Sequence, residues 1–326
     1  MKPRLEPSTA IPPPGPHGGD GARVAAALGL HPDQVLDLSA SLNPFAPDVP
    51  ALARRHLGAL GRYPDVEAAE AYLAAGLDVP ADRLVLTAGG AQAIALVAEQ
   101  LEAGWVEDPE FSLYRRHLRR IDPGAARWRS DPHNPSGRLA GSSAEAGDGR
   151  DRDGVPAVWD EAFLPLSAGV WTRGRPGWAV GSLTKAFACP GLRLGYALAP
   201  SGPEAAQLRR RRPAWAVGAL ACAVLPELME RADPPGWTRR IRSARADLDA
   251  VLRQHGWRPL PSEAPWLLVP RARGLRERLA PEGVIVRDCA SFGLTDHVRI
   301  AVPGDRGLEQ LDLALIAAGG STRTRG

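Results

Sequence analysis

Short apolar runs of strand length alternate with helical segments before residue 200. The segments predicted to be extended lie at residues 35–38, 83–87, 157–159, 178–180 and 194–198. The segments predicted to be helices lie at residues 23–30, 51–60 and 66–76, and from the Gly89-Gly90 pair through Gly104. Strands that alternate with helices predict an α/β sheet, rich in parallel strands and with helical crossovers.

The pattern changes after four consecutive arginines at residues 209–212. The helices predicted beyond them lie at residues 214–232, 238–255 and 307–318, and the strands at 266–269, 284–287 and 298–301. Residues 141–154 are small, polar and charged, which predicts an exposed loop. The whole pattern predicts an N-terminal arm at residues 1–36, a large domain at 37–203 and a smaller α+β domain at 204–326.

The composition is typical of a globular protein. At 326 residues, with 44% hydrophobic and 24% charged residues, the chain is long enough for two domains. No apolar run approaches the ~18–20 residues of a membrane span, and the proline-rich N-terminus lacks the apolar core of a secretory signal. We therefore expect no membrane partner.

The cysteines and the net charge indicate the compartment and limit the expected partners. Cys189, Cys222 and Cys289 have no CxxC spacing, which indicates reduced thiols in a cytoplasmic protein and argues against a zinc site. The net charge is only +3, and the arginines at 209–212 are interpreted as a solvated helix end. Because no zinc-finger or RNA-binding motif accompanies them, nucleic acid is not an expected partner.

Positive charge is carried almost entirely by arginine. Of the 40 basic residues, only Lys2 and Lys185 are lysines. Arginine keeps its proton at any working pH, whereas a lysine amine can become neutral and form an imine with an aldehyde. Lys185 is therefore a candidate nucleophile, and a lysine kept by chance is the alternative.

Side chains suited to an anion surround Lys185 in the sequence. The motif SLTK (182–185) follows a predicted strand, and Arg193 comes shortly after it. Two hydroxyls and an arginine suit a phosphate dianion. The motif GGAQ (89–92) lies between a predicted strand and a helix, where small residues let helix N–H groups approach phosphate. An ordinary βα turn has the same pattern.

Two further polar positions complete a set. Asp160 ends an apolar run, and the turn DPHNPSG (131–137) presents Asn134. An acid at the carboxyl end of a strand can keep a pyridine nitrogen protonated, although a surface acid is the alternative. Pyridoxal 5′-phosphate needs an imine-forming lysine, a phosphate anchor, an acid and groups that hold its ring. The sequence therefore predicts a pyridoxal-phosphate site in the large domain.

The ordered motifs resemble those of a known family. GGAQ, HNPSG (133–137), WDEAF (159–163) and SLTKAFACPGLRLGY (182–196) resemble the fold-type I, class I/II aminotransferases of the histidinol-phosphate aminotransferase group. The similarity extends from about His17 to Ala301, and the last motif is the most specific. It implies a large α/β domain rich in parallel strands, which binds pyridoxal phosphate, and a smaller α+β C-terminal domain.

The resemblance also implies roles for individual residues. Lys185 would form the imine and move protons. Asp160 would pair with the pyridine nitrogen, Asn134 would contact the ring hydroxyl, and Phe111 would stack on the ring. The residues that would hold the cofactor phosphate are Gly90, Ala91, Ser182, Thr184 and Arg193.

Beyond the cofactor, the resemblance implies a partner and a substrate class. Tyr63 of the RYPD motif would reach the neighbouring subunit's cofactor, which implies a homodimer with shared active sites. A small anionic amino-acid substrate would be bound by His17, Asn43, Arg287 and Arg299. For the two arginines, surface positions in an arginine-rich chain are the alternative.

Two reactions share all of these cofactor residues. The motifs HGGD (17–20), DLSASLNP (37–44) and PAWAV (213–217) most resemble the threonine-phosphate decarboxylases of cobalamin biosynthesis. Those enzymes convert L-threonine O-3-phosphate to (R)-1-amino-2-propanol phosphate. An aminotransferase of the histidinol-phosphate or aromatic amino acid type is the alternative. A catalytically degenerate binding protein with this fold is a third possibility.

Three features depart from the family pattern. Phe163 stands where aminotransferases usually have a tyrosine, and His133 replaces an asparagine before Asn134. The segment 118–131 is shorter than its counterpart in the family. This shortening predicts that a strand–helix unit at one edge of the large sheet is truncated or absent.

Overall fold

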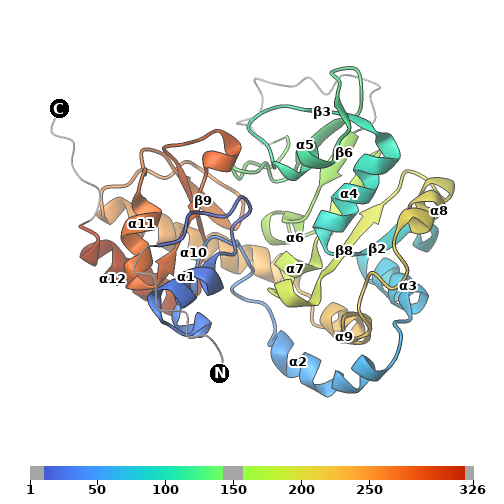
Figure 1. The fold of residues 1–326 in the computed structure, drawn as a ribbon, viewed down its shortest axis with the longest axis horizontal. Helices are drawn as coiled ribbons and strands as arrows, with labels where there is room; N and C mark the ends of the chain where they lie inside the picture. Colours follow the sequence, from blue (N-terminus) through green and yellow to red (C-terminus); the bar gives the residue numbers. More distant parts are fainter. Residues whose placement is uncertain (1–10, 142–156, 320–326) are drawn as a thin grey trace, which may run out of the picture. The chain divides into compact units, whose positions relative to one another are not determined.

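A computed structural model describes residues 11–141 and 157–319. The chain forms two compact units, and each is described separately (Figure 1). Unit 1 comprises Met1–Pro44, Pro135–Gly137 and Ile241–Gly326, and unit 2 comprises Phe45–Asn134 and Arg138–Arg240. Apart from Gly141, the loop predicted at residues 141–154 lies outside the described residues.

Unit 2 is built on a seven-stranded sheet. In the order of the sheet, the strands are β2 (Leu84–Ala88), β8 (Leu194–Leu198), β7 (Trp178–Gly181), β6 (Ala157–Asp160), β5 (Arg127–Ser130), β3 (Ala103–Val106) and β4 (Arg120–Ile121). Strand β8 is antiparallel to β2 and β7, and the other neighbouring pairs are parallel. The α/β class and the richness in parallel strands predicted from the sequence are confirmed.

Helices pack on this sheet and complete its hydrophobic core. Helix α4 (Gly90–Leu101) packs on β2, β7 and β8, while α3 (Val66–Leu77) packs on β2 and on α9 (Ala219–Glu230). Apolar residues of the sheet and of α4 form one buried cluster, which includes Val85, Val97, Val158 and Val180. Burial of each such side chain contributes about 1.5–3 kcal/mol. The other α-helices in the described part of unit 2 are α2 (Val49–Arg55), α5 (Leu113–His117), α6 (Leu164–Ser167), α7 (Leu183–Ala186), α8 (Gly202–Arg211) and the start of α10 (Pro234–Gln254), up to Arg240.

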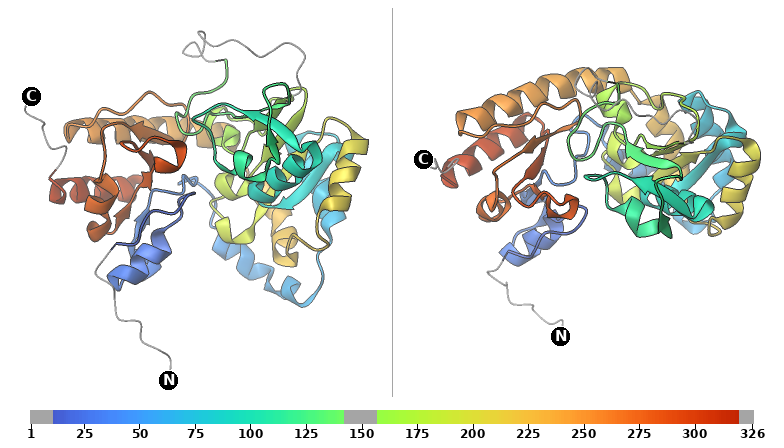
Figure 2. Two further views of the ribbon diagram at one scale, coloured as in Figure 1. Left: turned by 45° about the horizontal axis from the view of Figure 1, so that its top comes forward. Right: turned by 90° about the horizontal axis from the view of Figure 1, so that it is seen from above.

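Unit 1 contains two small sheets. Strands β11 (Arg287–Asp288), β12 (Val298–Ala301) and β9 (Trp266–Val269) form an antiparallel sheet, and β1 (Leu36–Asp37) pairs in parallel with β10 (Val284–Ile285). The helices are α1 (Gly21–Leu28), α11 (Leu275–Leu279), α12 (Asp305–Ala317) and the part of α10 (Pro234–Gln254) that follows Arg240. Helices α10 and α12 lie side by side (Figure 2). In the described part of the chain, no helix combines the length and apolar character needed to cross a membrane.

Several predicted elements have different bounds in the structure. The helix predicted through Gly104 is wrong at its end, because Glu102 adopts φ 58° and the next four residues form β3. The helix predicted at 51–60 is α2 followed by a separate 3₁₀ helix, Leu57–Gly61. The strand predicted at 284–287 is divided between β10 and β11, which belong to different sheets.

The shortened segment forms one edge of the large sheet. Strand β4 has only two residues, and residues 122–126 connect it to β5 without a helix. Strand β5 was not predicted from the sequence, because its apolar and charged residues alternate (RWRS) over only four positions. In the structure β5 lies between β3 and β6.

The two units also differ from the division predicted at residue 204. Helix α8 packs on the 3₁₀ helix Ala81–Arg83 and on β2, and α9 packs on α3, so both helices belong to unit 2. At the other end of the chain, β1 pairs with β10, so the segment up to Pro44 belongs to unit 1. Packing, rather than position along the chain, decides these memberships.

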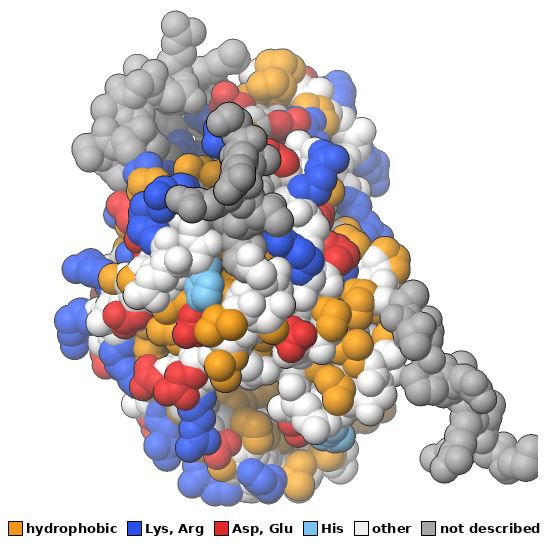
Figure 3. Space-filling view, turned by 90° about the vertical axis from the view of Figure 1, so that its left-hand side faces the viewer, with side chains coloured by type: hydrophobic (Ala, Val, Ile, Leu, Met, Phe, Trp, Pro, Cys, Tyr) orange, Lys and Arg blue, Asp and Glu red, His pale blue; other side chains and the backbone are white. Residues whose placement is uncertain are grey.

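The arginines at 209–212 are not a uniformly solvated helix end. Glu70 is 6% exposed, and its carboxylate pairs with Arg209 Nε at 3.0 Å and with the guanidinium of Arg212. The Leu86 N–H also donates to Glu70 Oε1 at 3.0 Å. Figure 3 shows the molecule from the left-hand side of Figure 1, away from α8, and on that face Lys and Arg side chains are interspersed with Asp and Glu.

Candidate active site

Several predicted cofactor residues lie at the carboxyl ends of the parallel strands in the large sheet, and this end of the sheet is called the cofactor edge below. Asp160 is the last residue of β6, and its cross-strand partners are Ser130 at the end of β5 and Val180 in β7. Lys185 lies in α7, shortly after β7. Ligands of open α/β sheets bind outside the carboxyl ends of the strands. The arrangement therefore provides a site at this edge of unit 2.

An anion cradle lies where β2 leads into α4. Gly89 adopts φ 83°, and a Cβ at this position would lie 2.4 Å from Arg193 Nη2, so only glycine lets the guanidinium approach. A Cβ at Gly90 would lie 3.3 Å from Ser182 Cβ. Among the described residues, the N–H groups of Gly90 and Ala91 at the start of α4 have no hydrogen-bond partner. Helix N–H groups beside an arginine and a serine fit a phosphate.

The Asp160 carboxylate is held by two donors. The Tyr114 hydroxyl donates to Oδ2 at 2.8 Å, and the Ala162 N–H donates to Oδ1 at 3.0 Å. The residue is partly exposed, but burial of the carboxyl group raises its pKa, while these two hydrogen bonds and the positive charge of Lys185 oppose that rise. A carboxylate that is held in this way can accept a hydrogen bond from the protonated nitrogen of a pyridine ring.

Aromatic and amide groups surround the same edge. The Nζ atom of Lys185 lies 5.6 Å from the ring centroid of Phe163, so the lysine faces this aromatic ring. Phe111 meets Tyr114 edge to face, with ring centroids 5.8 Å apart. Asn134 is 7% exposed, and its backbone N–H donates to Ser130 Oγ at 2.7 Å.

Thr184 and Tyr63, two further residues predicted to contact a cofactor, make other contacts within unit 2. Thr184 is buried, and its hydroxyl donates to the Leu194 carbonyl at 3.3 Å, so its proton is directed to the backbone rather than to the anion cradle. Tyr63 is 76% exposed, and its ring centroid lies 4.7 Å from that of Trp215.

Unit 1 holds the predicted substrate residues. Arg287 and Arg299 are cross-strand partners in β11 and β12 and are only 3% and 4% exposed, so neither is a surface arginine. Burial lowers the pKa of both guanidinium groups, and the charge of Arg287 lowers the pKa of Arg299 further. Two buried positive charges on neighbouring strands favour an anionic ligand.

The HGGD segment packs against one of these arginines. Arg287 Nη2 donates to the Pro16 carbonyl at 2.8 Å, and Gly18 is so close that a Cβ would lie 3.2 Å from Arg287 Nη1. Both ring nitrogens of His17 are buried. Asn43 is 2% exposed in the same unit. The structure therefore brings the HGGD turn to Arg287.

Sequence reasoning missed a group of polar residues beneath the cofactor edge. Glu110 Oε1 accepts from Ser130 Oγ at 2.5 Å, and Glu110 Oε2 accepts from the Ser130 N–H at 3.0 Å. Ser130 Oγ in turn accepts from Asn134, and Tyr114 binds Asp160. No local signal in the sequence indicates these contacts, because Ser130 and Asp160 end strands that lie far along the chain from Glu110 and Tyr114.

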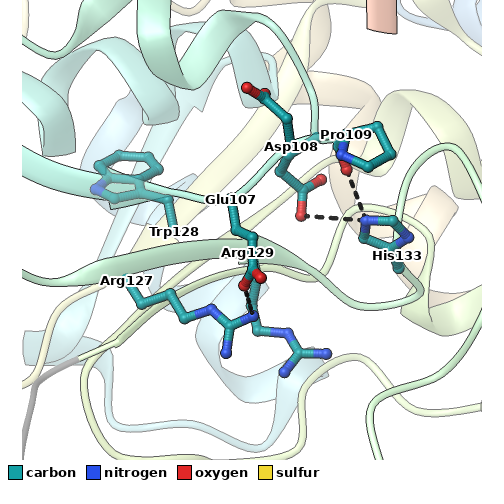
Figure 4. A pocket seen from close by; sticks show the side chains of 8 residues that line it. Glu107, Asp108, Pro109, Arg127, Trp128, Arg129 and His133 are labelled. Atoms are coloured by element: carbon teal, nitrogen blue, oxygen red, sulfur yellow. Dashed lines mark hydrogen bonds and ion pairs between the residues drawn. The ribbon is translucent and has the colours of Figure 1, made fainter. Parts of the chain in front are cut away.

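A cavity of about 220 Å³ lies beside this group (Figure 4). Its lining includes Glu110 and His133, the sequence neighbours of Phe111 and Asn134, together with Arg127, Arg129 and Glu107. Arg127 Nη2 pairs with Glu107 Oε2 at 2.7 Å, and His133 Nε2 lies 2.8 Å from the Pro109 carbonyl. None of the residues predicted to bind the substrate lines this cavity, so we do not assign the substrate to it.

The sheet, the lysine after β7 and the acid at the end of β6 define an enzyme of the fold-type I class, which uses pyridoxal 5′-phosphate. Comparison with known sequences gives the family. The profile described as Aminotransferase class I and II matches residues 130–314. The chain belongs to this family.

Relatives with two activities match nearly the whole chain. Threonine-phosphate decarboxylase of Salmonella typhimurium is 28% identical over 351 residues, which cover 92% of this chain and 95% of that protein. Histidinol-phosphate aminotransferase of Natronomonas pharaonis is 30% identical over 321 residues, which cover 85% of this chain and 89% of that protein. Histidinol-phosphate aminotransferase of Sinorhizobium meliloti, solved in complex with pyridoxal-5′-phosphate, matches with a TM-score of 0.75 at 17% identity, over 91% of this chain and 94% of that one.

These findings establish the general chemistry. The protein is a pyridoxal-phosphate-dependent enzyme of the decarboxylase or aminotransferase type, with a substrate of the amino-acid kind. The predicted family, fold class and cofactor are confirmed.

Proposed function

We propose that the protein decarboxylates L-threonine O-3-phosphate to (R)-1-amino-2-propanol phosphate, in cobalamin biosynthesis. The observation that carries this proposal is the buried pair Arg287 and Arg299 on neighbouring strands. Two adjacent guanidinium groups suit a substrate with two anionic groups. L-Threonine O-3-phosphate has a phosphate and a carboxylate, so each guanidinium group would have an anionic partner.

The HGGD turn supports the same substrate. Because Pro16 and Gly18 contact Arg287, the turn can present His17 and its backbone to a group bound by that arginine. We propose that His17, Asn43, Arg287 and Arg299 orient the substrate. The bond at Cα that breaks is the one held perpendicular to the cofactor ring, so these residues would select loss of the carboxylate by turning the substrate.

The remaining proposed roles belong to unit 2. When bound, pyridoxal phosphate supplies an electron sink for the electron pair of the broken bond. Lys185 attaches the cofactor and returns a proton to Cα, while Asp160 keeps the pyridine nitrogen protonated. Asn134 contacts the ring hydroxyl and Phe111 stacks on the ring. The phosphate is held by Gly90, Ala91, Ser182 and Arg193, with Thr184 contributing if its hydroxyl turns from Leu194.

We also propose that the enzyme works as a cytoplasmic homodimer. The exposed ring of Tyr63, beside that of Trp215, supports a contact with a second subunit. In this arrangement Tyr63 contributes to the neighbouring subunit's cofactor site.

A product assay tests the reaction. Purified holoenzyme is incubated with L-threonine O-3-phosphate and no keto acid, and carbon dioxide and aminopropanol phosphate are measured. We expect stoichiometric formation of both products, and no product from the Lys185→Ala variant. Amino-group exchange that depends on 2-oxoglutarate would instead identify an aminotransferase. If neither activity is found, the degenerate binding protein is the remaining interpretation.

A further inference from the structure

Tyr114 is a buried phenol that the roles proposed above do not use. It is 0% exposed, and its hydroxyl donates to Asp160 Oδ2 at 2.8 Å. Because the Ala162 N–H occupies Oδ1, both oxygens of Asp160 have a protein donor. The Asp160 carboxylate is therefore fixed in orientation by two separate elements, α5 and the start of the turn after β6.

The contact also affects the charge of Asp160. Burial raises the pKa of this carboxyl group and so favours its neutral form. A neutral Asp160 could not balance a protonated pyridine nitrogen. The Ala162 N–H, the Tyr114 hydroxyl and the charge of Lys185 all lower the pKa again, because hydrogen bonds to a carboxylate favour its charged form.

Tyr114 is suited to remain the donor in this pair. Burial, with the negative charges of Asp160 and Glu110, raises the pKa of its phenol well above the ordinary value, so the hydroxyl keeps its proton. Its ring packs between Phe111 and Trp128, with centroid distances of 5.8 and 5.5 Å. The aromatic packing holds the hydroxyl in place.

We propose that Tyr114 is a positioning residue that keeps Asp160 ionised and directed at the pyridine nitrogen of pyridoxal phosphate. This inference rests on the proposed role of Asp160. It does not depend on whether the enzyme decarboxylates or transaminates its substrate.

The test is the affinity of the full-length apo-protein for pyridoxal phosphate. Tyr114→Phe keeps the ring and removes the hydroxyl. Since a hydrogen bond to a charged group is lost, we expect the dissociation constant to rise about ten- to a hundredfold. The matched control is Tyr72→Phe, which removes another phenol that donates to a carboxylate (Glu230, 3.1 Å) on an exposed surface. The control should bind like the parent.

The pH profile separates this role from a purely structural one. The titratable groups that act on Asp160 are Tyr114 from α5 and Lys185 from α7, and Tyr196 of β8 responds to its charge. Cofactor affinity should fall as the pH drops and Asp160 takes up a proton. Without the Tyr114 hydroxyl, the Asp160 pKa rises, so this fall should begin at higher pH. A structural role would lower the unfolding temperature of the apo-protein and leave the profile unchanged.

A double-mutant cycle gives the decisive outcome. If Tyr114 acts through Asp160, Tyr114→Phe should have no further effect on cofactor affinity in an Asp160→Asn background. Two independent effects that multiply would overturn the inference. Should Tyr114→Phe fail to fold, Tyr114→His is the second variant, because it keeps a ring but its nitrogens do not reach as far as the Tyr114 hydroxyl. The same rise in the dissociation constant is then expected, and affinity equal to that of the parent would contradict the inference.

Borohydride reduction distinguishes this failure from failure of the cofactor assignment. Reduction of the parent holoenzyme should fix the cofactor on Lys185, as seen by peptide mass spectrometry. Labelling at Lys185 with equal affinities of parent and Tyr114→Phe would overturn only the role of Tyr114. An unlabelled Lys185 would overturn the assignment of the lysine itself.

Discussion

At the scale of single residues, burial and charge pairing together distinguish Arg287 and Arg299 from the other arginines. Arg276 is equally buried, at 2% exposed, but it pairs with Glu277 at 3.2 Å. Of 38 arginines, Arg287 and Arg299 lie in the interior of unit 1 on neighbouring strands. Burial lowers the pKa of both groups, because a charge in the protein interior loses its hydration. A bound anion would compensate both charges at once.

Removal of either arginine should therefore weaken substrate binding more than stability. We expect Arg287→Ala and Arg299→Ala to lower kcat/KM for L-threonine O-3-phosphate by about a hundredfold or more, because each leaves an anionic group unpaired. The unfolding temperature should change little, since the mutual repulsion is relieved. Steady-state kinetics and thermal unfolding measure the two effects. Arg242→Ala, on the exposed face of α10, is the control, and equal kinetic effects at 242 and 299 would contradict the prediction.

At the scale of elements, one buried carboxylate connects three segments of unit 2. Glu70 of α3 pairs with Arg209 in α8 and with Arg212 just beyond it, and it accepts the N–H of Leu86 in β2. Arg209 and Arg212 also donate to the carbonyls of Leu84 and Leu86. These contacts explain why two of the four consecutive arginines point toward the protein.

Neutralising this carboxylate should destabilise unit 2. Glu70→Gln leaves two partly buried guanidinium groups without their counter-charge, so we expect a loss of about 3–5 kcal/mol in the free energy of unfolding. Urea denaturation measures it. The matched control is Glu99→Gln, which breaks the exposed pair with Arg211 and should cost less than about 1 kcal/mol. Equal losses in the two variants would show that burial of Glu70 does not matter.

At the scale of the whole molecule, the proposed dimer makes each active site depend on two chains. If Tyr63 reaches the neighbouring cofactor, subunits of Lys185→Ala and Tyr63→Ala should complement each other. Each variant should be nearly inactive alone. A refolded equimolar mixture should recover about a quarter of the parent activity, because half of the dimers are mixed and each has one intact site. A mixture no more active than its components would contradict shared sites.

The sequence by itself predicted the cofactor and the residues proposed to bind it. Lys185, Asp160 and the small residues at 89–91 could be chosen from their types and their places after strands, because imine formation, acid–base pairing and phosphate binding each need particular groups. The predicted bounds of β8, β9 and β12 agree with the structure, since each is an apolar run of strand length.

Only the tertiary structure decided which polar groups support the cofactor edge and where the compact units divide. Tyr114 and Asp160 are 46 residues apart, and Glu70 and Arg212 are 142 residues apart. No local periodicity relates such positions, because their contact depends on the order of strands in the sheet. The turn into β3 and the burial of Arg287 and Arg299 also followed from pairing between distant strands. Long-range pairing sets which charges lose contact with water, and so which of many similar side chains can act on a ligand.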